Sequence, residues 1–325
     1  KGMVDGGGLA KKRVMSYGDY PDDAYTGIAD GDYHKKCIVR SNGVVENFAL
    51  GVDKATFIPL EGKDFMDPQY LSEEVDHSWF AYPDGTSTLH PLDGVTDPKF
   101  TGPKSGTKEK WEYLDEDKKY SWIKSPTFKG KTAEVGPLAK YIVVYTKVKQ
   151  GIITDPTWAE SMMVRQIDTV SQVLGVPAHV WMTTMVGRTA CRGLDAQVAS
   201  NISQYFFDKL VANIKNGDTT VADTSKFEPN KWPKDAKGVG LVEAPRGGLG
   251  HWIHIKDGRS ANYQCIVPST WNACPKTAAN EHGAYEDSMI DTHVKIADKP
   301  LEILKVIHSF DPCLACATHL YNKKG

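Results

Sequence analysis

Hydrophobic and polar residues follow different patterns on the two sides of residue 136. Beyond it, apolar residues recur at the three- and four-residue spacing of helices that bury one face. Residues 137–150 show this pattern with proline at the start, and a second segment runs from Thr157 to about Leu174. The longest pattern, Ala178 to about Asn216, contains no proline and predicts one helix of about 39 residues. Helices of this length usually belong to a bundle.

Two segments have the composition of β-hairpins. Residues 35–50 contain two β-rich runs around an Asn-Gly pair, and the runs 250–256 and 260–267 flank an Asp-Gly pair. Both pairs favour the tight type I′ turn, which needs positive φ at its two central residues. Short helical segments follow, and Lys299-Pro300 precedes a final predicted helix, Leu301–His308.

The first 135 residues are polar and rich in turns, with little predicted regular structure before residue 34. A loop-rich region of this length usually wraps a protein surface, either a partner subunit or the remainder of its own chain. A second polar stretch, 217–240, also indicates a loop or linker. We therefore predict a mainly α fold, a multihelical bundle with small β-hairpins and long loops. We divide it into a loop-rich region, 1–135, and a helical and metal-ligand region, 136–325.

Composition narrows the class of protein. The 325 residues are 40% hydrophobic and 25% charged with a net charge of −2, which is ordinary for a globular protein and gives no reason to expect nucleic-acid binding. The longest apolar run is far shorter than a membrane span, and the start has no pattern of a signal peptide. Six cysteines without regular spacing do not indicate a disulfide scaffold. The polar start without methionine leads us to expect a fragment of a longer chain.

The strongest chemical signal lies near the end of the chain. Cys313 and Cys316 are three positions apart, and His319 follows three positions later. Residues at this spacing share one face of a helical turn, and thiolates select soft or borderline metals. The pattern fits neither a thioredoxin-like motif nor a haem attachment site, because no βαβ pattern surrounds it and alanine follows the second cysteine. Structural zinc, inert thiols and a catalytic metal all remain compatible with it, and Cys191 in the long predicted helix is interpreted as buried packing.

Five separated blocks of the sequence form one recognisable set. They are Tyr120–Pro126, Glu134–Ala139, Glu243–Gly247, Val267–Asn272 and His308–His319. In this order they resemble the C-terminal part of the large subunits of nickel–iron hydrogenases, of the membrane-associated uptake type. The resemblance covers essentially the whole chain.

The resemblance implies roles for particular residues. Cys313 would be a terminal thiolate on nickel, and Cys316 would bridge nickel to an iron that carries cyanide and carbon monoxide ligands. Arg246 would stand over the open face of the metal pair, oriented by Asp311. Such a fixed cation can polarise a substrate and hydrogen-bond a cyanide ligand.

Further positions follow from the same resemblance. Ser269 would donate to the other cyanide, and Pro245 would line the pocket. His319 and the backbone carbonyl of Cys265 would bind a magnesium or ferrous ion near the C-terminus. From the residues alone, Arg246 is better explained as a surface residue or helix-end cap, and Asp311 and Ser269 as helix N-caps.

The implied function is heterolytic oxidation of dihydrogen. Electrons would pass through an iron–sulfur small subunit to a cytochrome b and quinone, because this chain has no cysteine set for such clusters. The heterodimer would be exported together to the periplasmic face of the membrane, where it would be peripheral. A maturation endopeptidase would cut after His319.

Two departures leave alternatives open. The family's other CxxC pair, which completes the four thiolates on nickel, does not occur in these residues, nor do the expected N-terminal glutamates. This fragment alone is therefore expected to be inactive. The alternatives are a metal-free structural relative of the complex I type and a zinc-stabilised binding module that uses Cys313, Cys316 and His319.

Overall fold

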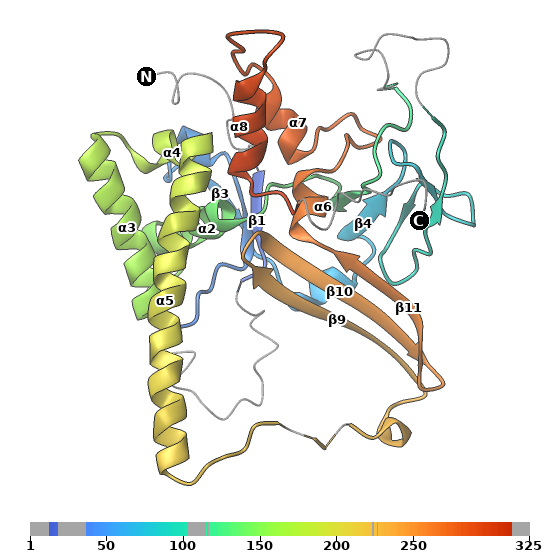
Figure 1. Ribbon diagram of the computed structural model, residues 1–325, viewed down its shortest axis with the longest axis horizontal. Coiled ribbons are helices and arrows are strands. Elements are labelled where there is room, and N and C mark those ends of the chain that lie inside the picture. Colours follow the sequence, from blue (N-terminus) through green and yellow to red (C-terminus); the bar gives the residue numbers. More distant parts are fainter. Residues whose placement is uncertain are drawn as a thin grey trace, which may run out of the picture.

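The computed structural model describes residues 13–18, 37–102, 115, 117–222, 224–225 and 227–313. These residues form helices and four small sheets (Figure 1). The helices are α2 (Pro137–Lys149), α3 (Trp158–Leu174), α4 (Ala178–Trp181), α5 (Met185–Lys215), α6 (Pro268–Asn272), α7 (Ala284–Met289) and α8 (Leu301–Ser309). With 36% helix and 21% strand, the prediction of a mainly α fold is not confirmed, because helices and sheets both contribute substantially.

All four sheets are antiparallel. One sheet has the order β1-β2-β3, formed by Arg13–Ser16, Gly43–Glu46 and Thr56–Ile58. A second has the order β6-β4-β8, formed by Thr88–Leu89, Leu71–Glu74 and Ser125–Phe128. The pair β5-β7 joins Phe80–Ala81 to Asp97–Pro98. The longest strands form the sheet β11-β10-β9, from Arg259–Ile266, Gly247–Lys256 and Asp235–Ala244.

The long predicted helix is interrupted. It divides into α4 and α5, because Thr184 caps the start of α5 by accepting a hydrogen bond from the N–H of Gly187 through its side chain. A Cβ at Gly187 would lie 2.1 Å from the carbonyl oxygen of Met182, so this close turn requires glycine. The predictions of α2, α3 and α8 are confirmed, and α3 begins with a capping box formed by Thr157 and Glu160.

One hairpin prediction is confirmed and the other is wrong. Asp257 and Gly258 have φ of 51° and 72° and turn β10 into β11, as the Asp-Gly pair predicts. Around Asn42-Gly43, however, the chain does not fold back on itself. Gly43 begins β2, which pairs with β1 and β3 instead, and Asn42 is held by Lys147 Nζ at 3.1 Å from its Oδ1. The stretch 217–240 was interpreted as a loop, but it contains most of β9.

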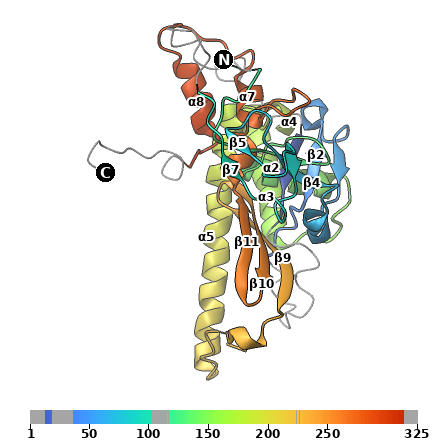
Figure 2. The same cartoon turned by 90° about the vertical axis from the view of Figure 1, so that its right-hand side faces the viewer.

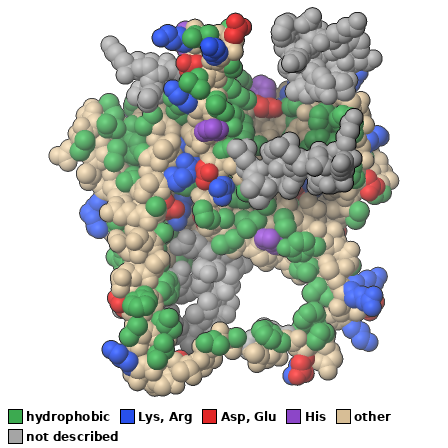
Figure 3. Space-filling model, viewed as in Figure 1, with side chains coloured by type: hydrophobic (Ala, Val, Ile, Leu, Met, Phe, Trp, Pro, Cys, Tyr) green, Lys and Arg blue, Asp and Glu red, His purple; other side chains and the backbone are tan. Residues whose placement is uncertain are grey.

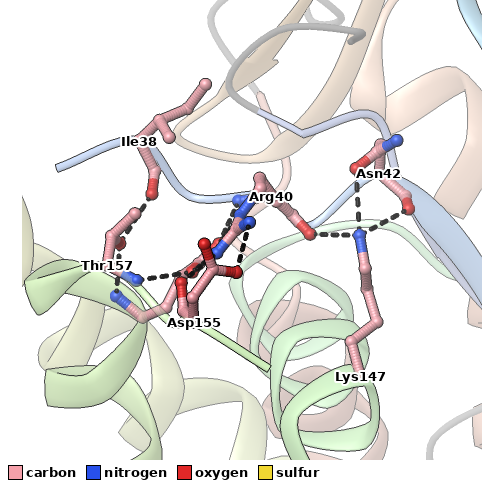
Figure 4. Close-up of polar contacts among 7 residues, drawn as sticks. Ile38, Arg40, Asn42, Lys147, Asp155 and Thr157 are labelled. Carbon is pink, nitrogen blue, oxygen red and sulfur yellow. Dashed lines mark hydrogen bonds and ion pairs between the residues drawn. The ribbon is translucent and has the colours of Figure 1, made fainter. Parts of the chain in front are cut away.

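The segment before β2 is fixed to the helices by buried and partly buried polar contacts (Figure 4). Arg40 donates from Nη2 to Glu160 Oε2 at 2.7 Å, and its backbone N–H donates to Oε1 of the same carboxylate at 2.8 Å. Its carbonyl oxygen accepts from Lys147 Nζ of α2 at 2.6 Å. Thr157 Oγ1 donates to the carbonyl of Ile38 at 2.8 Å. The end of α2 and the start of α3 are thereby coupled to the segment that leads into the first sheet.

Two hydrophobic cores contain residues from both parts of the chain. In the first, α2 packs against α3 and α5, together with Val14, Val39, Val45 and Phe48. The second joins the small sheets to Trp252 of β10, Ile266 of β11 and Trp271 of α6. The described parts of the loop-rich region therefore pack against their own chain.

The C-terminal part of α5 extends beyond α2 and α3 (Figures 1 and 2). Figure 3 shows hydrophobic side chains along this part and an opening between it and the β9–β11 sheet. The exposed large side chains here are Phe206, Phe207, Leu210 and Ile214. None of the helices in the described residues is both long and apolar enough to cross a membrane.

Candidate metal centre

Arg246 lies at the tip of the β9–β10 hairpin. Ala244 pairs with Gly247, so that Pro245 and Arg246 form a two-residue turn. The turn packs against the start of α2, because a Cβ at Gly247 would come within 2.6 Å of the nitrogen of Gly136. Gly247 also has φ of 123°, a conformation that L side chains rarely adopt. These two glycines place the arginine where two of the five sequence blocks meet.

Asp311 is the partner of this arginine. Arg246 Nε donates to the backbone carbonyl of Asp311 at 2.8 Å and lies 3.2 Å from Oδ2, while Nη2 donates to Oδ1 at 3.3 Å. Both side chains are 39% exposed, so the pair is open to one side. The expected pairing of Arg246 with Asp311 is present, and an arginine held at several atoms is a cation of fixed position.

Cys313 follows two residues later and is half-buried. Its backbone N–H donates to Ser269 Oγ in the first turn of α6 at 3.4 Å. Ser269 is therefore not the N-cap of α6, whose N-cap is Val267. The carboxylate of Asp311 is engaged by Arg246, and the residues from Asp311 to Cys313 are not helical. The three segments that carry Arg246, Ser269 and Cys313 thus converge.

The start of α2 is joined to α6 as well as to the hairpin. Asn272 Oδ1 accepts from the N–H of Val135 at 2.9 Å, and its Nδ2 donates to the carbonyl of Val135 at 2.9 Å. The neighbouring Trp271 donates from Nε1 to the hydroxyl of Tyr17 at 2.8 Å. Paired hydrogen bonds of this kind in a buried position fix the relative placement of the two segments.

Sequence reasoning did not assign the buried ion pair beside this site. Arg188 of α5 and Glu134 before α2 have side chains that are 2% and 1% exposed, with Nε 2.6 Å from Oε1 and Nη2 2.9 Å from Oε2. Arg188 Nη2 also donates to Ser288 Oγ at 2.8 Å, and the guanidinium carbon lies 3.9 Å from the ring centroid of Phe310. Glu134 belongs to a sequence block, but its partner could not be read from the chain.

Two further residues surround Asp311. Arg192, one helical turn after Arg188, places Nε 3.8 Å from Asp311 Oδ2 and donates from Nη2 to the carbonyl of Ser309 at 2.9 Å. Burial lowers the pKa of Arg192, an effect that Asp311 opposes. The ring of Tyr285 packs on Phe310 at 4.7 Å between centroids. Burial, with a smaller effect of Asp311, raises the pKa of Tyr285 to about 12, so its hydroxyl stays protonated at neutral pH.

Of the remaining predicted residues, the structure describes some and leaves others outside its described ranges. Cys265 lies on β11 opposite His251, and its Sγ is 3.2 Å from His251 Nδ1. Cys316 and His319 lie outside the described residues. Cys191 is buried in the first core, as interpreted from the sequence, and burial raises the pKa of its thiol. Within the described part of the chain, no three His, Cys, Asp or Glu residues are grouped so that they could hold a metal ion.

Comparison with known proteins decides the family. The family description "Nickel-dependent hydrogenase" matches residues 4–319. The chain belongs to this family. This membership confirms the resemblance of the five sequence blocks to nickel–iron hydrogenase large subunits.

Hydrogenase large subunits from several bacteria are similar to this chain over nearly its whole length. The uptake hydrogenase large subunit of Rhizobium leguminosarum bv. viciae is 44% identical over 327 residues, which cover 100% of this chain and 51% of the relative. The hydrogenase-1 large chain of Escherichia coli (strain K12) is 41% identical over 321 residues, which cover 98% of this chain and 50% of the relative. The chain spans about half the length of the curated relatives it matches.

Solved hydrogenases share the fold. The NiFeSe hydrogenase of Desulfomicrobium baculatum has a TM-score of 0.64 at 24% identity, covering 98% of this chain and 54% of that one. A NiFeSe hydrogenase variant from Desulfovibrio vulgaris Hildenborough has a TM-score of 0.66 at 24% identity with the same coverage. At this level of identity the similarity establishes the fold alone.

The described residues suit one side of a nickel–iron site. Cys313 supplies a soft sulfur donor and is half-buried; its backbone N–H donates to the Ser269 hydroxyl, and the guanidinium of Arg246 holds Asp311, two residues before it. Both groups can donate hydrogen bonds to anionic ligands of a metal. A complete set of thiolates requires residues beyond the described ones, because no group of three ligands occurs among these.

Proposed function

We propose that this chain is the C-terminal part of the catalytic subunit of a nickel–iron uptake hydrogenase, which splits dihydrogen heterolytically. The observation that carries the proposal is the convergence of Arg246, Asp311, Ser269 and Cys313 from three separate segments. Together they bring the segment with a soft ligand into contact with a hydroxyl, and they fix a cation on Asp311, two residues before that ligand. Cysteines with a purely structural role would not require a fixed arginine and a hydroxyl group in the neighbouring segments.

We assign the following roles. The thiolates of Cys313 and Cys316 hold the metals, and the bound nickel–iron pair supplies the redox-active Lewis acid that polarises dihydrogen. Arg246 remains charged and acts as a fixed positive group at the open face. Asp311 sets the orientation of that guanidinium through the contacts described above. The proton that heterolysis releases would go to the sulfur of Cys313 or to the Arg246 region.

Other groups complete the pocket in this proposal. Ser269 donates to a cyanide ligand of iron while it accepts from the Cys313 N–H, since a hydroxyl can do both. Pro245 lines the pocket from the hairpin turn. His319 and the carbonyl of Cys265 bind a magnesium or ferrous ion. The boundary near residue 135 separates a loop-rich part from the part that carries these ligands.

The proposal includes partners and a location. Because the chain lacks a cysteine set for iron–sulfur clusters, electrons leave through a small subunit and then through a membrane cytochrome b to quinone. The heterodimer lies at the periplasmic face of the membrane, and an endopeptidase removes the residues after His319. The exposed side chains of α5 pack against the remainder of the large subunit, since relatives are about twice as long as this chain.

The test uses the full-length large subunit, co-expressed with its small subunit and maturation proteins. We expect nickel and iron in the purified complex and hydrogen-dependent reduction of a dye. Cys313→Ala should abolish that activity, whereas Cys37→Ala, which changes a buried cysteine of the first part of the chain, should retain it. A folded complex without metal would favour a structural relative of the complex I type. Zinc in place of nickel and iron would favour a binding module.

A further inference from the structure

We propose that Arg188, through its pairing with Glu134, is a positioning residue that sets the placement of the Cys313 thiolate. The inference rests on the proposed function, because it concerns the ligand of that site. Arg188 acts on the segment that begins at Ser309 and Phe310, which leads through Asp311 and Pro312 into Cys313.

The Glu134–Arg188 ion pair holds the Arg188 guanidinium in a fixed position. Both side chains are almost fully buried, and the two groups meet through two parallel hydrogen bonds. A bidentate arginine–carboxylate pair fixes the plane of the guanidinium as well as its position. Glu134 precedes Val135, and Asn272 of α6 makes hydrogen bonds to both the N–H and the carbonyl of Val135. The ion pair is therefore linked to α6, the helix that carries Ser269.

The other face of the same guanidinium holds the segment in front of the cysteine. Arg188 Nη1 donates to Ser309 Oγ at 3.4 Å, and the ring of Phe310 packs on the guanidinium plane at 3.9 Å from its carbon to the ring centroid. Arg192 adds a hydrogen bond to the carbonyl of Ser309 at 2.9 Å. α5 therefore contacts the side chains of both Ser309 and Phe310, and the backbone carbonyl of Ser309.

The next residue shows why this support matters. Asp311 has φ of 56°, a left-handed conformation that few residues other than glycine adopt and that persists where the surroundings impose it. Arg246 holds its carbonyl and carboxylate on one side, and the fixed Phe310 precedes it on the other. If Phe310 lost its support, the turn could relax toward a more ordinary backbone conformation, and Cys313 would move relative to Ser269.

The chemistry selects arginine over lysine at this position. Lysine could pair with Glu134, but an ammonium group lacks the flat face that packs on Phe310 and the fork that reaches Ser288 and Ser309 together. Arg188→Lys should therefore keep the buried charges paired and still lose the positioning contacts. Glu134→Leu with Arg188→Met removes both charges together, and replacement of a buried pair by apolar residues of similar volume is often tolerated for stability.

The experiment uses the mature holoenzyme with its small subunit. Nickel content, the nickel electron paramagnetic resonance spectrum, and kcat and KM for dihydrogen are measured for Arg188→Lys and for the Glu134→Leu/Arg188→Met double variant. The matched control is Glu73→Leu/Lys124→Met, because this ion pair is also buried, with Lys124 9% and Glu73 1% exposed, but joins β4 to the residue before β8. Thermal unfolding of each complex reports stability separately from the site.

We expect both Arg188 variants to retain nickel, to show shifted g-values, and to lose about 10- to 100-fold in kcat, as expected for a ligand displaced by a fraction of an ångström. The control pair should change thermal stability alone. Unchanged g-values and kcat in a loaded Arg188→Lys enzyme would overturn the inference. The same would follow if the control pair shifted the spectrum as strongly. A wild-type complex without nickel would instead contradict the proposed function.

Discussion

The two halves of α5 have very different surroundings. From Met185 to Val198 the helix contributes Arg188, Cys191 and Val198 to the interior, and it contacts α2, α3 and α8. From residue 199 to its end, none of its residues is buried, and Phe207 is 59% exposed. Both halves have a helical sequence, and they are continuous in one helix (Figure 2).

This difference shows that contacts within the described residues fix the position of the first half of α5 but not of the second half. The first half is fixed by side-chain packing and by the ion pair that leads to the candidate metal centre. The second half carries apolar side chains that gain nothing from exposure, and exposed apolar clusters of this kind mark protein contacts. We therefore expect substitutions in the first half to change stability and the site, and substitutions in the second half to change assembly.

The largest expected effect is at Arg188. Arg188→Met leaves the carboxylate of Glu134 buried without its partner, and we expect a loss of about 3–5 kcal/mol in the free energy of unfolding. Urea denaturation of the 325-residue chain measures it. Adding Glu134→Leu should recover most of the loss, because it removes the carboxylate that Arg188→Met leaves behind. A loss below about 1 kcal/mol in the single variant would show that the buried pair does not determine the stability of this half.

A smaller effect is expected at the start of the helix. Gly187→Ala places a Cβ 2.1 Å from a backbone carbonyl, so the chain must shift, at a cost of about 1–3 kcal/mol. Gly193→Ala is the matched control, since it lies in the same helix with nothing within 4 Å of the added Cβ. That change should stabilise the protein by about 0.5–1 kcal/mol. Thermal unfolding distinguishes the two, and equal shifts of the same sign would refute the packing argument.

The smallest effect on stability is expected in the second half. Phe207→Ser with Leu210→Ser should change the free energy of unfolding of this chain only slightly, by about 0.5 kcal/mol for each surface position. In the full-length subunit the same double variant should lower the yield of folded, nickel-containing complex. Size-exclusion chromatography with metal analysis measures this yield. An unchanged yield would argue that this surface remains free in the whole protein.

Much of the helical structure could be predicted from local sequence, because proline starts and apolar spacing act over a few residues. The predictions of α2 and α8 rested on such signals. The break between α4 and α5 could not be seen, since it depends on the close approach of Gly187 to Met182. β9 was missed because its alternation is weak, and its strand conformation depends on pairing with β10 over its full length.

Some contacts of the candidate site could likewise be predicted from the sequence, and others could not. The pairing of Arg246 with Asp311 followed from the family resemblance of their sequence blocks, and the contact of Ser269 with the Cys313 N–H shows that these blocks meet. Arg192 and Tyr285 carry no local signal, because their importance arises only where α5 and α7 approach Asp311. Arg188 could not be assigned from the sequence, since its partner Glu134 is more than fifty residues away.

The central claim is that Cys313 holds nickel while Arg246 acts on the substrate without holding the metal. The most direct measurement is nickel per large subunit, with hydrogen-dependent dye reduction, for Cys313→Ser and Arg246→Lys in the mature complex. We expect Cys313→Ser to lose nickel and activity together. Arg246→Lys should retain nickel near the wild-type level and lose at least about 100-fold in kcat. Full nickel content in Cys313→Ser, or unchanged kcat in Arg246→Lys, would contradict this account.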